Sequence, residues 1–238
     1  GIRVVLPAAS PRTQTWRDAL GRITATRDAD GFDTMTRYSP LAQESFDHED
    51  LHPAPPFHST PERREFDGLG HVLVQAAILP DRTIANHYEH DAAGRLRAHI
   101  DPAGHTSRYT YDGAGRLRRV DAPDAGTVQQ FFDATGQLTE RRDATGARVT
   151  WTHDRLGRVL TERALDPAGN LTGEARYIYD RGQDPADASS RGKLTAVEDA
   201  AGRIDFDHDL RGRIVRVTRQ FAAHAGLVTL SQRTEYDA

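Results

Sequence analysis

The chain has 238 residues and a net charge of -4, with 37% hydrophobic and 28% charged side chains. Its mean hydropathy of -0.67 leaves too few apolar side chains to fill a deep globular interior at native density. The charge lacks the basic excess that drives nucleic-acid binding, no stretch is apolar enough to span a membrane, and the absence of cysteine excludes disulfides within the chain.

A short internal repeat is the dominant feature of the sequence. An aspartate is followed three residues later by a glycine twelve times, from Asp18/Gly21 to Asp209/Gly212. Aspartate at the first position of a type I turn can accept backbone N–H bonds, and glycine at the fourth position can adopt the positive φ of a bulge. Such turns join antiparallel strands, and short β-prone runs such as 108–111 and 116–120 flank them. The repeat therefore predicts tandem β-hairpins.

The first part of the chain is less regular. Residues 1–45 are interpreted as degenerate repeats, and the pattern is already under way at Gly1, which suggests a longer parent protein. Residues 46–64 form a loop insertion rich in proline and histidine, because the prolines at 53, 55, 56 and 61 cannot donate to a strand ladder. Residues 38–43 either form another degenerate turn or, with Ser39 and Pro40 as a cap, start a helix toward His52.

The insertion contains the one pattern that resembles an enzyme site. His48, Glu49 and His52 have the spacing of two zinc ligands and a catalytic glutamate, and His58 has the spacing of a third ligand. Pro53 would end a helix just after His52, and Pro55 stands where such proteases need a glycine with positive φ. The sequence therefore favours a solvated histidine-rich loop, with a zinc hydrolase as a remote alternative.

Residues 65–180 form the regular array. Its turn residues Asp91, Asp112, Asp133 and Asp154 are spaced by 21 residues, and the partner glycines are Gly94, Gly115, Gly136 and Gly157. Residues 181–190 are a polar loop insertion, and residues 191–238 carry further repeats that are truncated at the end. Because about twenty neighbouring strands cannot stay flat, we expect an all-β fold of tandem antiparallel hairpins in one long curved or spiral sheet.

Aromatic residues recur at or near the position before the turn aspartate, which predicts a ladder of aromatic rings stacked across neighbouring strands. They are Tyr88, Tyr109, Tyr111, Phe132, Tyr179, Phe206 and Tyr236.

Three segments carry a family resemblance. Residues 111–117 (YDGAGRL), 153–159 (HDRLGRV) and 17–23 (RDALGRI) resemble the YD repeat of RHS proteins, and the resemblance covers most of the chain. It implies a segment of a hollow β-shell, the RHS-type cocoon, that encloses a C-terminal toxin in polymorphic toxins and toxin complexes. It also implies a structural role without catalysis or cofactors.

The resemblance further implies partners and a location. The expected partners are flanking repeats of the same parent protein, an enclosed toxin domain and a delivery-system protein. The protein would be synthesised in the bacterial cytoplasm and delivered outside the cell. The alternative from another class is a cell-surface adhesion or carbohydrate-binding repeat module that uses exposed tyrosines such as Tyr109 and Tyr111.

Overall fold

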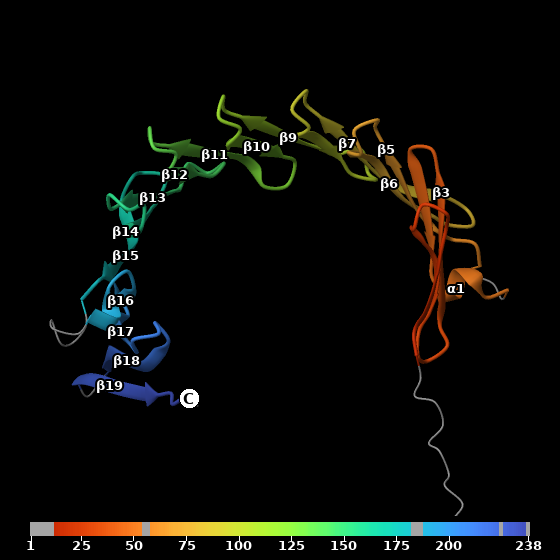
Figure 1. The fold of residues 1–238 in the computed structure, drawn as a ribbon. Coiled ribbons are helices and arrows are strands. Elements are labelled where there is room, and N and C mark those ends of the chain that lie inside the picture. The colour runs from red at the N-terminus through yellow and green to blue at the C-terminus, as the bar shows by residue number, and fades with distance from the viewer. Residues whose placement is uncertain (1–11, 54–57, 182–187, 224–225, 237–238) are drawn as a thin grey trace, which may run out of the picture. The chain divides into compact units, whose positions relative to one another are not determined.

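The computed structural model describes residues 12–53, 58–181, 188–223 and 226–236. Within them the chain forms nineteen strands, one short helix and one 3₁₀ turn (Figure 1). All strand pairs given below are antiparallel, which confirms the expected all-β hairpin architecture. The degenerate repeats expected in residues 1–11 lie outside the described residues, as do positions 55, 56 and most of the polar loop.

The chain forms two compact units, residues 1–110 (unit 1) and 111–238 (unit 2). The strands of unit 1 are β1 (Gln14–Arg17), β2 (Ile23–Arg27), β3 (Asp33–Ser39), β4 (Ala42–Phe46), β5 (Glu62–Phe66), β6 (Val72–Ile78), β7 (Thr83–His90), β8 (Leu96–Ile100) and β9 (Thr106–Tyr111). From β1 to β9, each strand pairs with the next one in the sequence.

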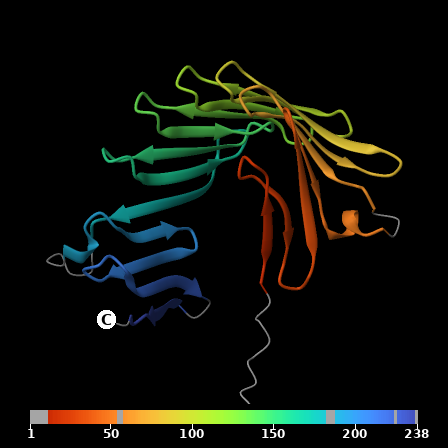
Figure 2. The same cartoon turned by 45° about the vertical axis from the view of Figure 1, so that its right-hand side comes forward.

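Unit 2 continues the same chain order. Its strands are β10 (Leu117–Ala122), β11 (Gly126–Phe132), β12 (Leu138–Arg142), β13 (Arg148–His153), β14 (Val159–Leu165), β15 (Leu171–Tyr179), β16 (Leu194–Asp199), β17 (Gly202–His208), β18 (Ile214–Ala223) and β19 (Gly226–Arg233), with the 3₁₀ turn η1 at Ala188–Ser190. Each strand again pairs with its successor. Figure 2 shows that the sheet of unit 2 curves as the strands succeed one another.

The fold has little interior. Only four apolar side chains among the described residues are buried, namely Phe46, Ala76, Ala98 and Ala196. The accessible surface is 16707 Å², whereas a compact protein of 26.3 kDa would expose roughly 10,600 Å². Backbone pairing and contacts between neighbouring side chains therefore hold these sheets, in place of a packed core.

The two faces of unit 2 differ in chemistry. Directly opposite residues share a face, and so do alternate residues along a strand. One face, called the apolar face, carries mainly apolar side chains, with Arg141, Glu162 and Asp199 among them. The apolar ones are Val149, Trp151, Ala164, Ala175, Tyr177, Val197 and Ile204. The other, called the charged face, carries Glu140, Thr150, Arg163, Glu174, Arg176, Glu198 and Arg203. Arginines pair with the glutamates of the charged face, for example Arg163 with Glu174 at 2.9 Å.

The insertion between β4 and β5 is shorter than the expected 46–64, because β4 extends to Phe46 and β5 begins at Glu62. The helix α1 covers His48–Leu51, and Asp47 caps its N-terminus in a reciprocal capping box with Asp50. The buried Asp50 also accepts hydrogen bonds from the backbone N–H and the hydroxyl of Thr60, at 2.9 and 2.6 Å. The Asp50 carboxylate thus accepts hydrogen bonds from both ends of the insertion, at Asp47 and at Thr60.

The idea of a helix starting at Ser39–Pro40 is wrong. These residues begin a tight turn instead, in which Ser39 and Ala42 pair directly and Leu41 has a φ of 58°. Strand β4 follows at once, because Ala42 to Ser45 pair with residues of both β3 and β5. The alternative interpretation of residues 38–43 as a degenerate turn describes this segment.

Candidate functional site

The recurrent feature of both units is the Asp-x-x-Gly turn. In the turn between β7 and β8, Asp91 Oδ1 accepts hydrogen bonds from the backbone N–H of Ala93 at 2.9 Å and of Arg95 at 3.0 Å. The Gly94 N–H donates to the Asp91 carbonyl at 2.9 Å, and Gly94 has a φ of 77°. The same carboxylate and carbonyl contacts recur in the turns of Asp112/Gly115, Asp133/Gly136 and Asp154/Gly157.

The second carboxylate oxygen of many turns binds the side chain four residues further on. Arg116 pairs with Asp112 at 2.7 Å, and Arg158 pairs with Asp154 at 2.7 Å. Histidine replaces arginine in two turns of unit 1, where His71 Nδ1 lies 2.8 Å from Asp67 Oδ2 and His105 Nδ1 lies 2.9 Å from Asp101 Oδ2. The turn aspartate therefore orients this fifth residue as well as closing the turn.

The oriented arginine reaches the aromatic residue of a later strand. The guanidinium carbon of Arg158 lies 4.4 Å from the centre of the Tyr179 ring, and that of Arg116 lies 4.7 Å from the Phe132 ring. Arg22 with Tyr38 and Arg213 with Tyr236 repeat the contact, at 4.2 and 4.4 Å. At Phe132, Tyr179 and Tyr236 the expected stacking of aromatic ring on aromatic ring is therefore wrong, because an arginine provides the contact.

The same side chains also lie over the next turn. A Cβ atom added at Gly94 would fall 2.5 Å from His71 Nε2, and one added at Gly136 would fall 3.0 Å from an Arg116 nitrogen. These two glycines therefore serve twice, since they supply a positive φ and leave room for the neighbouring side chain. We call the repeated set of turn aspartate, fifth residue and later aromatic the turn ladder.

Hydrogen bonds in the turn ladder favour the ionised carboxylates. The contact with His71 and the turn amides lowers the pKa of Asp67 to about 2. The side chain and backbone N–H of Arg95 likewise lower the pKa of Asp91, and the N–H and guanidinium of Arg158 lower the pKa of Asp154. These carboxylates are therefore charged at neutral pH and occupied by their own turns.

Arg158 holds the most contacts in the turn ladder and gives a direct test of it. It binds Asp154 and Asp180, each at 2.7 Å, and it stacks on Tyr179. We expect Arg158→Gln to lower the thermal unfolding midpoint and to reduce the loss of stability that added salt causes. The matched control is Arg155→Gln in the same turn, because Arg155 is exposed and makes no ion pair in the described structure. Equal midpoints for the two variants would contradict a structural role for the turn ladder.

The three histidines of the zinc alternative do not form a ligand set in the described structure. His48 Nδ1 accepts the backbone N–H of Asp33 at 3.3 Å, and its ring packs edge-on against Phe32. The rings of His48 and His52 lie 6.2 Å apart between centres, and His58 is exposed in the turn before β5. No group of three metal-ligating side chains gathers anywhere in the described residues.

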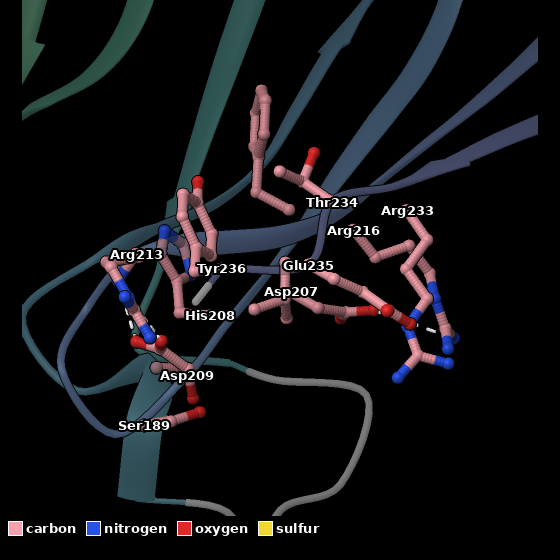
Figure 3. Close-up of a pocket in the computed structure, with 13 residues that line it drawn as sticks. Ser189, Asp207, His208, Asp209, Arg213, Arg216, Arg233, Thr234, Glu235 and Tyr236 are labelled. Atoms are coloured by element: carbon pink, nitrogen blue, oxygen red, sulfur yellow. Dashed lines mark hydrogen bonds and ion pairs between the residues drawn. The ribbon is translucent and has the colours of Figure 1, made fainter. Parts of the chain in front are cut away.

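A hollow of about 650 Å³ lies in unit 2, between η1, the turn after β17 and the end of β19. Figure 3 shows His208, Asp209, Arg213 and Tyr236 at one end of it, and Arg216, Arg233 and Glu235 at the other. Its acids lie beside arginines, with Arg216 at 3.8 Å from Asp207. Burial, together with the charge of Lys193, lowers the pKa of His208, whose Nδ1 is buried without a partner.

The turn ladder joins neighbouring hairpins through ion pairs and arginine–aromatic contacts. The acids and bases of the turn ladder are bound to one another. No α-helix of the described residues is long and apolar enough to cross a membrane. One part of the turn ladder is visible in the sequence, since arginine follows the turn aspartate by four residues at Arg116 and Arg158. Only the strand register shows which aromatic each arginine meets.

Comparison with known proteins agrees with the repeat. Residues 90–127 and 132–171 match the RHS Repeat family. No curated protein matches the chain. Among solved structures, a Photorhabdus luminescens Tc holotoxin pore is similar with a TM-score of 0.78 and 18% identity, over 95% of this chain and 13% of that one.

Two crystal structures of TcdB2–TccC3 are also similar. The first is the structure of TcdB2–TccC3–TEV, and the second is that of TcdB2–TccC3 without its hypervariable C-terminal region. Each has a TM-score of 0.74 and 19% identity to this chain. In both, the match covers 95% of this chain and 12% of the other. The chain thus spans about an eighth of the length of these proteins, and at this identity the likeness concerns the fold.

Proposed function

Because residues 90–127 and 132–171 match the RHS Repeat family, we propose that this chain is a structural wall segment of a secreted toxin shell. In this role flanking repeats of the same parent protein complete the wall, and the wall encloses and protects a C-terminal toxic passenger for delivery outside the cell. The function is enclosure, and no step of it requires catalysis by this chain. A delivery-system protein would be a further partner.

The observation that carries the proposal is the turn ladder on a sheet without a core. The turn aspartates are bound within their own hairpins, and four of the arginines link a hairpin to a later aromatic residue, namely Arg22, Arg116, Arg158 and Arg213. Such links join neighbours without any layer packed behind the sheet, so the strands can extend as a thin wall. The likeness to the Tc holotoxin pore and to TcdB2–TccC3, across 95% of this chain, supports the same use of the fold.

Limited proteolysis of the full-length parent protein tests the proposal. We expect its C-terminal region to resist protease while the repeats are folded, and to be cut at least about tenfold faster after the repeats unfold in mild denaturant. The same C-terminal region expressed alone is the control for its intrinsic resistance. Equal cutting rates with folded and unfolded repeats would contradict enclosure.

Glycan binding distinguishes the adhesion alternative. A wall segment gives no specific signal on a glycan array. Specific binding that is lost in Tyr109→Ala, with the far-UV circular dichroism unchanged, would replace the shell role by the adhesion role.

A further inference from the structure

We propose that Trp151, Glu162 and Tyr177 form a binding site for a lysine or arginine side chain of an extended polypeptide lying on the apolar face of unit 2. The proposal rests on the geometry of this sheet alone, so it does not depend on the shell role.

The strand register brings the three side chains together. Trp151 of β13 lies directly opposite Glu162 of β14, which in turn lies opposite Ala175 of β15. Tyr177 is two residues beyond Ala175, so it shares the face and is a diagonal neighbour of Glu162. The three residues are 26 positions apart at most in sequence, but they occupy one patch of three adjacent strands.

The indole of Trp151 contacts the carboxylate directly, since its Nε1–H donates to Glu162 Oε2 at 3.1 Å. Tyr177 is placed near the same carboxylate by the strand register. Burial, followed by the charge of Glu162, raises the pKa of the Tyr177 hydroxyl, in agreement with that placement. All three side chains are half-buried, so the carboxylate and both rings remain open to a ligand.

The charge of Glu162 sets it apart from the other strand glutamates of unit 2. Glu140, Glu174 and Glu198 each have an arginine within 2.6 Å, and all three lie on the charged face. Glu162 lies on the apolar face, and in the described part of the chain it forms no ion pair. Arg141 shares this face beside Val149, but it makes no ion pair with Glu162 either. A negative charge on an apolar surface therefore lacks its counterion.

The missing partner is best supplied by a basic side chain. Aromatic rings attract cations over their faces, and a carboxylate beside them adds a full opposite charge. Val149, Ala164, Ala175 and Val197 surround the site and would contact apolar residues on either side of the basic one. An extended segment in which lysine or arginine alternates with small apolar residues fits this surface.

Fluorescence of Trp151 gives the test. The chain has two tryptophans, so Trp16→Phe leaves Trp151 as the only one. The probe is a capped peptide of alternating valine and lysine, and its control has glutamine at every lysine position. In the Trp16→Phe chain we expect the lysine peptide to change the Trp151 emission and to bind about tenfold more tightly than the glutamine peptide.

Two variants identify the site. Glu162→Gln should reduce the affinity for the lysine peptide to that for the glutamine peptide, whereas Glu140→Gln on the charged face should leave it unchanged. Added salt provides a measurement without any change at the site, since it should weaken the lysine peptide and spare the glutamine peptide. Equal affinities for the two peptides, or full affinity in a folded Glu162→Gln chain, would overturn the proposal.

Discussion

Replacing Gly202 with alanine is expected to destabilise unit 2 more than the substitution of any other glycine that the structure describes. Gly202 starts β17 with a φ of 146°, and a Cβ atom there would lie only 2.0 Å from the backbone oxygen of Gln220. The unfavourable conformation costs about 1–3 kcal/mol. The clash with a backbone atom of β18, which cannot rotate away as a side chain can, adds roughly 1–3 kcal/mol more.

Two control glycines separate these costs. Gly21 has a φ of 79° with open space around it, so Gly21→Ala should show the conformational cost of about 1–3 kcal/mol alone. Gly68 has neither a positive φ nor a near neighbour, so Gly68→Ala should be close to neutral. Urea denaturation followed by circular dichroism ranks the three variants, and a Gly202→Ala chain as stable as Gly68→Ala would refute the close approach of β17 to β18.

Acid is expected to unfold the chain between about pH 4 and pH 2. The turn aspartates have pKa values below their ordinary range in the folded chain, and that of Asp67 is lowered to about 2. The unfolded chain therefore binds more protons in this interval than the folded chain does. The stabilisation is complete above the ordinary aspartate pKa, near 4, and is lost as the pH falls toward the folded values. Circular dichroism against pH measures it.

One substitution isolates a single turn in this acid transition. Asp67→Asn keeps an oxygen for the N–H groups of Leu69 and His71 but removes the titrating charge. We expect the stability of this variant to fall less steeply below pH 4. Asp81→Asn is the matched control, because Asp81 is exposed and accepts no hydrogen bond in the described structure. Identical pH curves for the Asp67→Asn and unsubstituted chains would count against the turn ladder as the acid-sensitive element.

The repeat made the hairpins predictable because each turn is a local structure. The residues that close the Asp112 turn lie within five positions of one another, so spacing alone indicates the turn. The pair Asp199/Gly202 has the same spacing but a different geometry. There the two residues pair directly and enclose a two-residue turn, with the Asp199 carboxylate accepting the N–H of Gly202 itself. Spacing does not distinguish these two turns.

Contacts between strands were harder to predict because they depend on register. The pairing of Trp151 with Glu162 follows from a turn at Asp154 that contains a bulge, and a shift of one residue would place Glu162 on the other face. The contact of Arg158 with Tyr179 spans 21 residues and needs the position of β15. The sequence therefore indicates which residues form turns, and the structure shows which side chains meet.

The placement of the turn aspartates explains how such a sheet can diverge. The Asp154 carboxylate accepts hydrogen bonds from Leu156 and Arg158, so these bonds are confined to the turn itself. The strands on either side pair through their backbones and through contacts with neighbouring strands, and most of their side chains are free of a common core. Strand side chains can therefore be replaced one hairpin at a time while the turn residues are kept. We expect the tolerance of such a chain to substitution to be modular, with the hairpin as its unit.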